Sequence, residues 1–246
     1  MPNRNPSRVK SLNRRNSTIE FQSKSGVNTV VKYYHKTYDI KDEYDKISEL
    51  SSILRNFPDF RCVKILGKTD SSLILECVAE PDLSCLNKSQ LQLLKADGDN
   101  FIKLFSHCHK NEFSFDSDLS NIFYSESESK YIFIDPTQES LDIDHLSFIV
   151  FSLSIIKSIG KGRSLNDFNN KLNFFRTLNK SYTELNDLTS NDILISYNSY
   201  ISVVNKWNLE MESGTGFLEF LWRKFLRLIW TLVLKYITII LRSNER

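Results

Sequence analysis

The 246-residue sequence lacks several features that assign a chain to a common class. Its four cysteines, Cys62, Cys77, Cys85 and Cys108, form no CxxC pair and show no zinc-site spacing, which favours free, buried thiols in a reducing compartment over disulfides. The formal net charge is only +2, so the composition gives no global basic signal and we expect no nucleic-acid partner. No internal repeat is visible.

The N-terminus also lacks an apolar stretch behind its basic residues. Residues 1–16 read M-P-N-R-N-P-S-R-V-K-S-L-N-R-R-N, which is basic but has no hydrophobic region of a secretory signal. We therefore expect residues 1–16 to be a flexible basic arm and the protein to be cytoplasmic.

The composition that is present fits a globular protein. Hydrophobic residues make up 41% of the chain and charged residues 25%. A chain of this length can form one large domain or two closely packed lobes.

The first third of the chain predicts strands with one helix. Residues 17–34 alternate apolar and polar around S-K-S-G, which predicts a β-hairpin. Residues 61–66 and 72–78 predict two further strands. Between them and the hairpin, residues 40–55 predict a helix, with an apolar stripe at Ile40, Tyr44, Ile47, Leu50 and Leu54.

The rest of the chain is mainly helical in pattern. Residues 89–110 and most of 143–207 predict helices, and 119–124 and 130–134 predict two short strands. The fold class is therefore α+β, with a β-rich N-terminal lobe over 17–80, a helical C-terminal lobe over 81–212 and a hinge near 78–84.

An Asp followed five residues later by Asn occurs twice, at Asp82…Asn87 and at Asp116…Asn121. Only the second pair follows a long predicted helix and runs into a strand, with another strand ending at Asp135 shortly after. We expect Asp116, Asn121 and Asp135 to lie close together at one end of this hairpin.

These residue types suit phosphoryl transfer. One Asp orients or deprotonates the attacking hydroxyl, while an Asn and a second Asp hold the magnesium ions that neutralise nucleotide phosphates. Such a site also needs a strand lysine that contacts the phosphates, and T-V-V-K (Thr29 to Lys32) supplies one. Glu43 lies on the apolar stripe of the predicted helix, unlike Glu49, and is placed to pair with Lys32.

In this order the motifs resemble the protein-kinase-like superfamily. Within it, S-F-D-S-D-L-S-N (Ser114 to Asn121) and I-D-P (Ile134 to Pro136) look most like the small-molecule branch, which includes aminoglycoside, choline and lipopolysaccharide-core kinases. The resemblance covers about residues 17 to 160. It implies a bilobal fold that uses ATP and Mg²⁺, with Asp116 as catalytic base, Asn121 and Asp135 as metal ligands, and Lys32 and Glu43 as nucleotide-binding residues.

Two positions depart from the family pattern. Ser114 stands where the family typically has a histidine that braces the catalytic loop, and the first hairpin offers Gly26 alone instead of a glycine-rich loop. These departures favour a second reading, a pseudokinase that serves as a membrane-tethered binding or scaffold protein. A third reading is an unrelated α+β domain.

The C-terminal segment 217–242 predicts an amphipathic helix. Its polar residues recur almost every four positions and leave a broad face of Leu, Ile, Phe and Trp. A membrane-spanning helix is disfavoured because Arg227 and Lys235 would cost about 2.5–3.5 kcal/mol each near the bilayer centre. Attachment to a membrane surface and packing on the helical lobe or on a partner subunit remain the two alternatives. The first implies a sugar or glycolipid acceptor at the inner face of the membrane.

Overall fold

The computed structural model describes residues 11–13, 17–24, 27–34, 40–136, 141–159, 164–210, 231–232, 235–239 and 241. The chain divides into two compact units. The first unit contains residues 1–82 and 120–137, and the second contains residues 83–119 and 138–246. The chain therefore passes from the first unit to the second between residues 82 and 83, and residues 120–137 return to the first unit.

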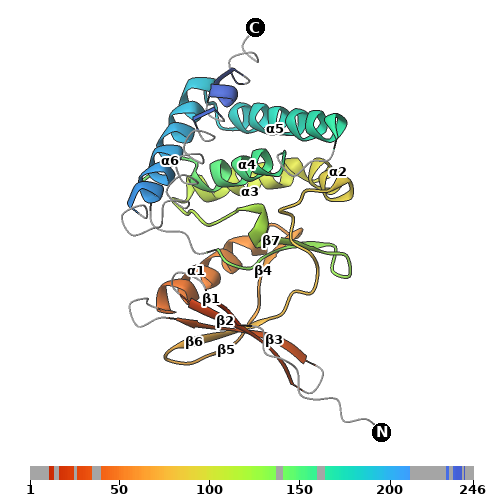
Figure 1. The fold of residues 1–246 in the computed structure, drawn as a ribbon, viewed down its shortest axis with the longest axis vertical. Coiled ribbons are helices and arrows are strands. Elements are labelled where there is room, and N and C mark those ends of the chain that lie inside the picture. Colours follow the sequence, from red (N-terminus) through yellow and green to blue (C-terminus); the bar gives the residue numbers. More distant parts are fainter. Residues whose placement is uncertain are drawn as a thin grey trace, which may run out of the picture. The chain divides into compact units, whose positions relative to one another are not determined.

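The larger sheet of the first unit is antiparallel and contains the predicted hairpin (Figure 1). Its strand order is β1 (Ser11–Asn13), β2 (Ser17–Lys24), β3 (Val27–Tyr34), β6 (Ser72–Glu76) and β5 (Ile65–Lys68). The hairpin over 17–34 is confirmed, with pairing from Ser17 opposite Tyr34 to Lys24 opposite Val27. Residues 11–13 of the expected flexible arm instead pair with β2.

A second, three-stranded sheet explains why 120–137 belongs to the first unit. Its order is β4 (Phe60–Cys62), β8 (Lys130–Phe133) and β7 (Ile122–Ser125), with β4 parallel to β8. The prediction of a single strand over 61–66 is therefore wrong, because these residues belong to two strands, β4 and β5. The chain pairs with β8 as far as Cys62, the Val63 N–H still donates to the Phe133 carbonyl at 2.8 Å, and the chain then enters the larger sheet as β5.

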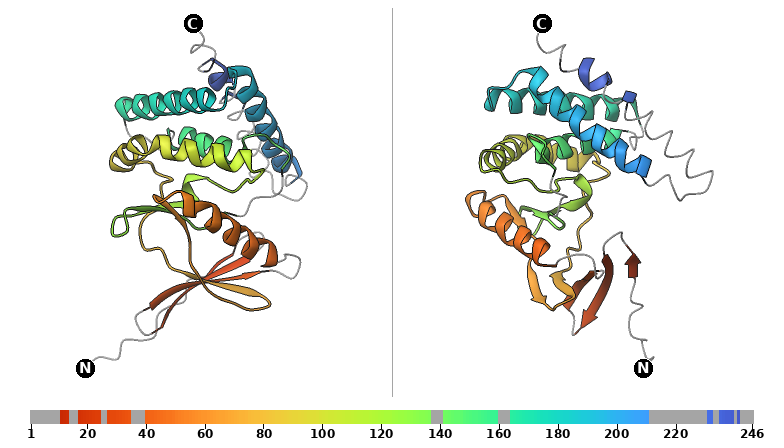
Figure 2. Two further views of the ribbon diagram at one scale, coloured as in Figure 1. Left: turned by 180° about the vertical axis from the view of Figure 1, so that it is seen from behind. Right: turned by 90° about the vertical axis from the view of Figure 1, so that its left-hand side faces the viewer.

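Helix α1 (Ile40–Ile53) continues into a short 3-10 helix, η1 (Leu54–Asn56), and packs against β4 and β6 (Figures 1 and 2). Ile47, Leu50 and Leu54 of its predicted stripe are buried. Tyr44 was expected on the same stripe but is exposed, and the Lys68 ammonium lies 4.4 Å from the centre of its ring. The favourable cation–π contact gives this aromatic ring a partner outside the core.

The second unit is helical within its described residues. Its helices are α2 (Lys88–Ala96), α3 (Gly98–Lys110), α4 (Leu146–Ile159), α5 (Leu165–Leu185) and α6 (Ser190–Glu210). The single helix predicted over 89–110 is broken at Asp97, the C-cap of α2. Helix α4 packs against α3, α5 and α6 (Figure 2) and is buried almost all round, as expected for a helix that is apolar on every side.

Most of the predicted tail helix over 217–242 lies outside the described residues. Among the described positions, Ile237 and Leu241 are buried, and the Ser190 hydroxyl donates to the Leu241 carbonyl at 3.3 Å. These contacts favour packing on the helical unit for the end of the tail. No helix in the described part of the chain is both long and apolar enough to cross a bilayer.

The four cysteines are free, as predicted, but the expected burial holds for only two of them. Cys62 and Cys108 are buried, whereas Cys77 is partly exposed and Cys85 is exposed. Burial raises the pKa of the Cys62 thiol to about 12, so this side chain behaves as a small apolar group.

Candidate functional site

Lys32 is buried although it carries a charge, with only 8% of its surface exposed. It lies on β3, where its neighbours across the sheet are Ile19 on β2 and Leu73 on β6. Its ammonium also lies 5.5 Å from the centre of the Tyr34 ring. A buried ammonium is costly unless it is paired, so its partners define the site.

The first partner is Glu43 on α1. The Lys32 Nζ donates to both Glu43 carboxylate oxygens at 2.9 Å, and Glu43 is 1% exposed. Glu49, which lies off the apolar stripe, is exposed. The periodicity of the helix thus brings a carboxylate inside beside Ile47 and Leu50.

The second partner is Asp135, which follows β8. The Lys32 Nζ donates to Asp135 Oδ1 at 3.2 Å. The β7–β8 pairing fixes this position, because the Ile134 N–H donates to the Asn121 carbonyl at 3.0 Å. Asn121 and Asp135 therefore stand at the open end of the same hairpin.

This cluster holds one cation and two carboxylates. Burial alone lowers the pKa of Lys32, but the charges of Asp135 and Glu43 and the hydrogen bonds to them outweigh it, so the pKa lies above its ordinary value. Burial raises the pKa of Glu43, and the Asp135 charge adds to this effect while Lys32 opposes it. The cluster thus has one carboxylate more than it has cations, which favours the approach of a further cation.

A cavity of about 300 Å³ in the first unit opens onto these groups. Lys32, Asn121 and Asp135 line it together with Glu76, Cys77, Asp82 and Ser120. Its remaining wall is apolar and consists of Ile19, Phe21, Val30, Val63, Leu75, Val78, Phe123 and Ile134. A mainly apolar cavity with a few convergent polar groups is the usual form of a small-molecule site.

Asp116 belongs to the second unit, whereas the other four predicted site residues belong to the first. Asp116 Oδ1 accepts a hydrogen bond from the Asp118 N–H at 2.9 Å, which closes a tight turn in the loop. Asp118 also forms an ion pair with Lys157 of α4 at 2.8 Å. On α6, burial raises the pKa of Tyr200, and the charges of Asp116 and Asp118 raise it further.

Two serines on α4 brace the loop that carries Asp116. The Phe115 N–H donates to the Ser147 hydroxyl at 2.9 Å, and the Ser117 hydroxyl donates to the Ser147 carbonyl. The Leu119 N–H donates to Ser154 at 3.2 Å. The loop is thus anchored without a histidine at position 114. Sequence reasoning missed these serines because they lie some thirty positions from the loop, and only the S-F-I-V-F-S-L-S pattern marks them.

Asn87 of the other Asp-x4-Asn pair has a structural explanation, whereas Asp82 lines the cavity that Lys32 also lines. The Asn87 side chain accepts from the Gln90 N–H at 3.0 Å, and the Gln90 side chain accepts from the Asn87 N–H at 2.9 Å. This reciprocal arrangement is a capping box at the start of α2.

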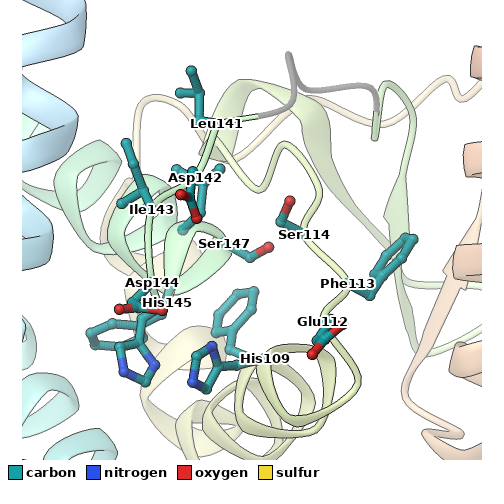
Figure 3. A pocket seen from close by; sticks show the side chains of 13 residues that line it. His109, Glu112, Phe113, Ser114, Leu141, Asp142, Ile143, Asp144, His145 and Ser147 are labelled. Atoms are coloured by element: carbon teal, nitrogen blue, oxygen red, sulfur yellow. The ribbon is translucent and has the colours of Figure 1, made fainter.

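A further cavity, of about 380 Å³, lies in the second unit beside Ser114 (Figure 3). His109 and His145 face each other there with ring centroids 3.8 Å apart, and His145 Nδ1 lies 3.0 Å from the Tyr182 hydroxyl. Burial, reinforced by the charge of His109, lowers the pKa of His145 to about 4. No motif in the sequence indicated this pair.

The described residues contain no group of three or more His, Cys, Asp or Glu side chains arranged to hold a metal ion. Mg²⁺ does not require such a group, because it commonly binds through one or two carboxylates together with substrate phosphates and water. Asn121 and Asp135, which line one cavity, fit that mode of binding.

No known family and no curated protein matches this sequence. Among solved structures, the chain is similar to the kinase PK-1 of Cydia pomonella granulovirus, with 22% identity and a TM-score of 0.38 over 52% of this chain and 51% of that one. It is also similar to Rv3197 of Mycobacterium tuberculosis, solved in complex with erythromycin, with 12% identity and a TM-score of 0.40 over 52% of this chain and 46% of that one. The chain thus matches about half the length of each of these proteins.

Proposed function

We propose that the protein is an ATP- and Mg²⁺-dependent phosphotransferase of protein-kinase-like fold. The observation that carries the proposal is the pairing of Lys32 with both Glu43 and Asp135 at a cavity that Asn121 also lines. Lys32, Glu43, Asn121 and Asp135 are spread over about a hundred positions of the chain. They occur in the order that the family resemblance implies.

The proposal gives each of these residues a role. The Lys32 ammonium, held in place by Glu43, binds the nucleotide phosphates, and the apolar wall of the cavity contacts the nucleobase. Asn121 and Asp135 are the residues that would hold Mg²⁺, which when bound neutralises charge on the phosphates. Asp116 is assigned as the base that orients the acceptor hydroxyl, on the strength of its position in the Asp-x4-Asn motif.

The acceptor is proposed to be a hydroxyl of a sugar or glycolipid at the membrane surface. This part of the proposal rests on the resemblance to lipopolysaccharide-core kinases and on the amphipathic pattern of residues 217–242.

A second candidate is a pseudokinase that binds nucleotide without turnover and acts as a membrane-tethered scaffold. The first hairpin favours it, because Gly26 stands alone there instead of a glycine-rich loop. Ser114 in place of a histidine points the same way, although the α4 serines supply another anchor for the loop.

Thermal denaturation with ATP and MgCl₂ tests the nucleotide site. At about 100 times the Kd, binding contributes about 2.7 kcal/mol and raises Tm by about 5–10 °C for a chain of this size. Asp135→Ala should abolish the shift, whereas Lys103→Ala, at an exposed position on α3, should retain it. If neither ATP nor GTP shifts Tm with any divalent ion, the proposal fails.

Transfer of labelled γ-phosphate separates the two candidates. The enzyme predicts Mg²⁺-dependent transfer to a sugar or glycolipid acceptor, which Asp116→Asn abolishes while the ATP-induced shift in Tm remains. The pseudokinase predicts a shift in Tm with no transfer in either protein.

A further inference from the structure

The first unit contains another cavity, of about 740 Å³, which the proposed nucleotide site does not use. One face of α1 and η1 forms part of its wall through Ile47, Ser48, Ser51, Leu54 and Arg55, which are spaced as neighbours on a helix. Phe60 and Val63 extend this wall, and both are buried. These apolar side chains form the floor of the cavity, with only a small part of their surface exposed.

The charged side chains that line this cavity are all cations. They are Arg55, Arg61, Lys64 and Lys130, with no carboxylate among the lining residues. Arg61 is neutralised by Glu128, through two hydrogen bonds of 2.7 Å, and by Glu76, which also lies 3.9 Å from Lys64.

The remaining two cations have no such direct partner, and the charge of Lys130 also acts on the Glu128 carboxylate. Among the described residues, Arg55 and Lys130 form no ion pair. Arg55 lies on η1, whereas Lys130 begins β8, so the two positive charges come from separate elements. An occupant with more than one anionic group matches them.

Two strands beside the cavity are end strands. Residues of β4 line it and β4 ends the three-stranded sheet, while Ile65 lines it and β5 ends the five-stranded sheet. An end strand presents a row of backbone N–H and C=O groups, and proteins commonly use such edges to bind an extended peptide. Between β4 and β5 the Cys62 carbonyl accepts from Arg61 and the Lys64 N–H donates to Glu76, so the groups open to a peptide lie on the strands themselves.

We propose that this cavity binds an extended acidic peptide segment of a partner protein. A large apolar side chain of the peptide occupies the floor, and flanking carboxylates pair with Arg55 and Lys130. Inorganic phosphate would leave the apolar floor uncovered, and a fatty acid offers one carboxylate for two cations. Nucleic acid requires an extended basic surface, whereas this chain has a net charge of only +2. The proposal is independent of the phosphotransferase function.

Fluorescence anisotropy of the labelled peptide Asp-Glu-Asp-Phe-Glu-Asp-Glu, in the absence of nucleotide, tests the proposal. Matched peptides replace Phe by Ser, or replace every acidic residue by its amide. Arg55→Glu and Lys130→Glu should each weaken binding about tenfold, because charge reversal substitutes repulsion for attraction. Lys103→Glu is the matched surface control. Ser48→Trp should block the cavity while the circular dichroism spectrum stays unchanged.

Support requires that both control peptides bind at least about tenfold more weakly and that only the cavity variants lose affinity. No binding up to about 1 mM peptide overturns the proposal. Equal binding by the amide peptide, or by the Arg55 and Lys130 variants, also overturns it. A site for another class of ligand is indicated if dodecanoate or oligo-dT binds with the same sensitivity to the variants while the peptide does not.

Discussion

In the first unit a lysine ammonium and two carboxylates meet around a cavity, whereas in the second unit serine hydroxyls, together with the ion pair between Asp118 and Lys157, hold the Asp116 loop to α4. Hydroxyls satisfy their hydrogen bonds at little electrostatic cost. The hydroxyls of Ser152 and Ser158, for example, return to carbonyl groups of their own helix. Burying charge is expensive, and the pairing that offsets it makes each partner depend on the others.

The difference indicates that the charged cluster of the first unit is suited to ligand binding, whereas the hydroxyl contacts of the second unit support the loop. The charged cluster stands at an opening, with Asp135 about a quarter exposed, and has one carboxylate more than it has cations. The hydroxyl contacts are closed within α4 and the adjoining loop. The predictions below disturb one region and then the other.

The largest effect is expected for Lys32→Met. It leaves the Glu43 carboxylate buried without its cation, which costs about 3–5 kcal/mol in the free energy of unfolding. The double variant Lys32→Met/Glu43→Gln should recover part of this loss because it removes the orphaned charge. Urea denaturation measures both. A loss below about 0.5 kcal/mol for the single variant would show that the pair is not buried as described.

A smaller loss is expected for Ser147→Ala. It removes the acceptor of the buried Phe115 N–H and should cost about 1–3 kcal/mol. Ser158→Ala is the matched control on the same helix, since its hydroxyl returns to the Ile155 carbonyl, and it should cost less. Equal losses from the two variants would remove the distinction between a loop anchor and an ordinary helix serine.

The two regions should also differ in their dependence on pH. Because burial and His109 depress the pKa of His145 from 6.5 to about 4, its contribution to stability is complete above pH 6.5 and is lost as pH falls toward 4. The raised pKa of Lys32 acts at the opposite end, with a contribution that is complete below about pH 10.5 and lost above it.

Unfolding free energies measured from pH 4 to 7 should therefore fall less steeply on the acid side for His145→Gln than for the natural protein. Parallel curves for the two proteins would mean that His145 does not titrate in this way.

The smallest effect concerns coupling between the two cavities of the first unit. Ile47, on the floor of the basic cavity, and Glu43, which holds Lys32, share α1. If the peptide and nucleotide sites are both real, the acidic peptide should change the Kd for ATP by about fivefold or less, and ATP should change the Kd for the peptide by the same factor. Unequal factors would show that the two measurements do not report one binding equilibrium.

Local patterns predicted much of the first unit. Alternation around S-K-S-G predicted the hairpin over 17–34, and helical periodicity placed Glu43 inside and Glu49 outside. Both follow from the period of one strand or one helix, which needs no knowledge of distant residues.

The wrong predictions concern positions whose structure depends on contacts with segments far away in the sequence. The run over 61–66 is apolar enough for one strand, but β8 pairs with its first part and β6 with its second, so it divides between two sheets. Tyr44 has the helical spacing of a core residue but finds its partner in Lys68 of β5. The anchoring serines and the basic cavity likewise depend on contacts between separate elements, which no local pattern encodes.

Binding of a fluorescent ATP analogue, titrated with and without Mg²⁺, tests the central claim most directly. We predict saturable binding that Mg²⁺ strengthens. Lys32→Met should abolish this binding, and Asp135→Asn should remove its dependence on Mg²⁺. Circular dichroism checks that the Asp135→Asn variant is folded. Binding that both variants retain unchanged would contradict the account, because the cluster of Lys32, Glu43 and Asp135 would then have no part in holding a nucleotide.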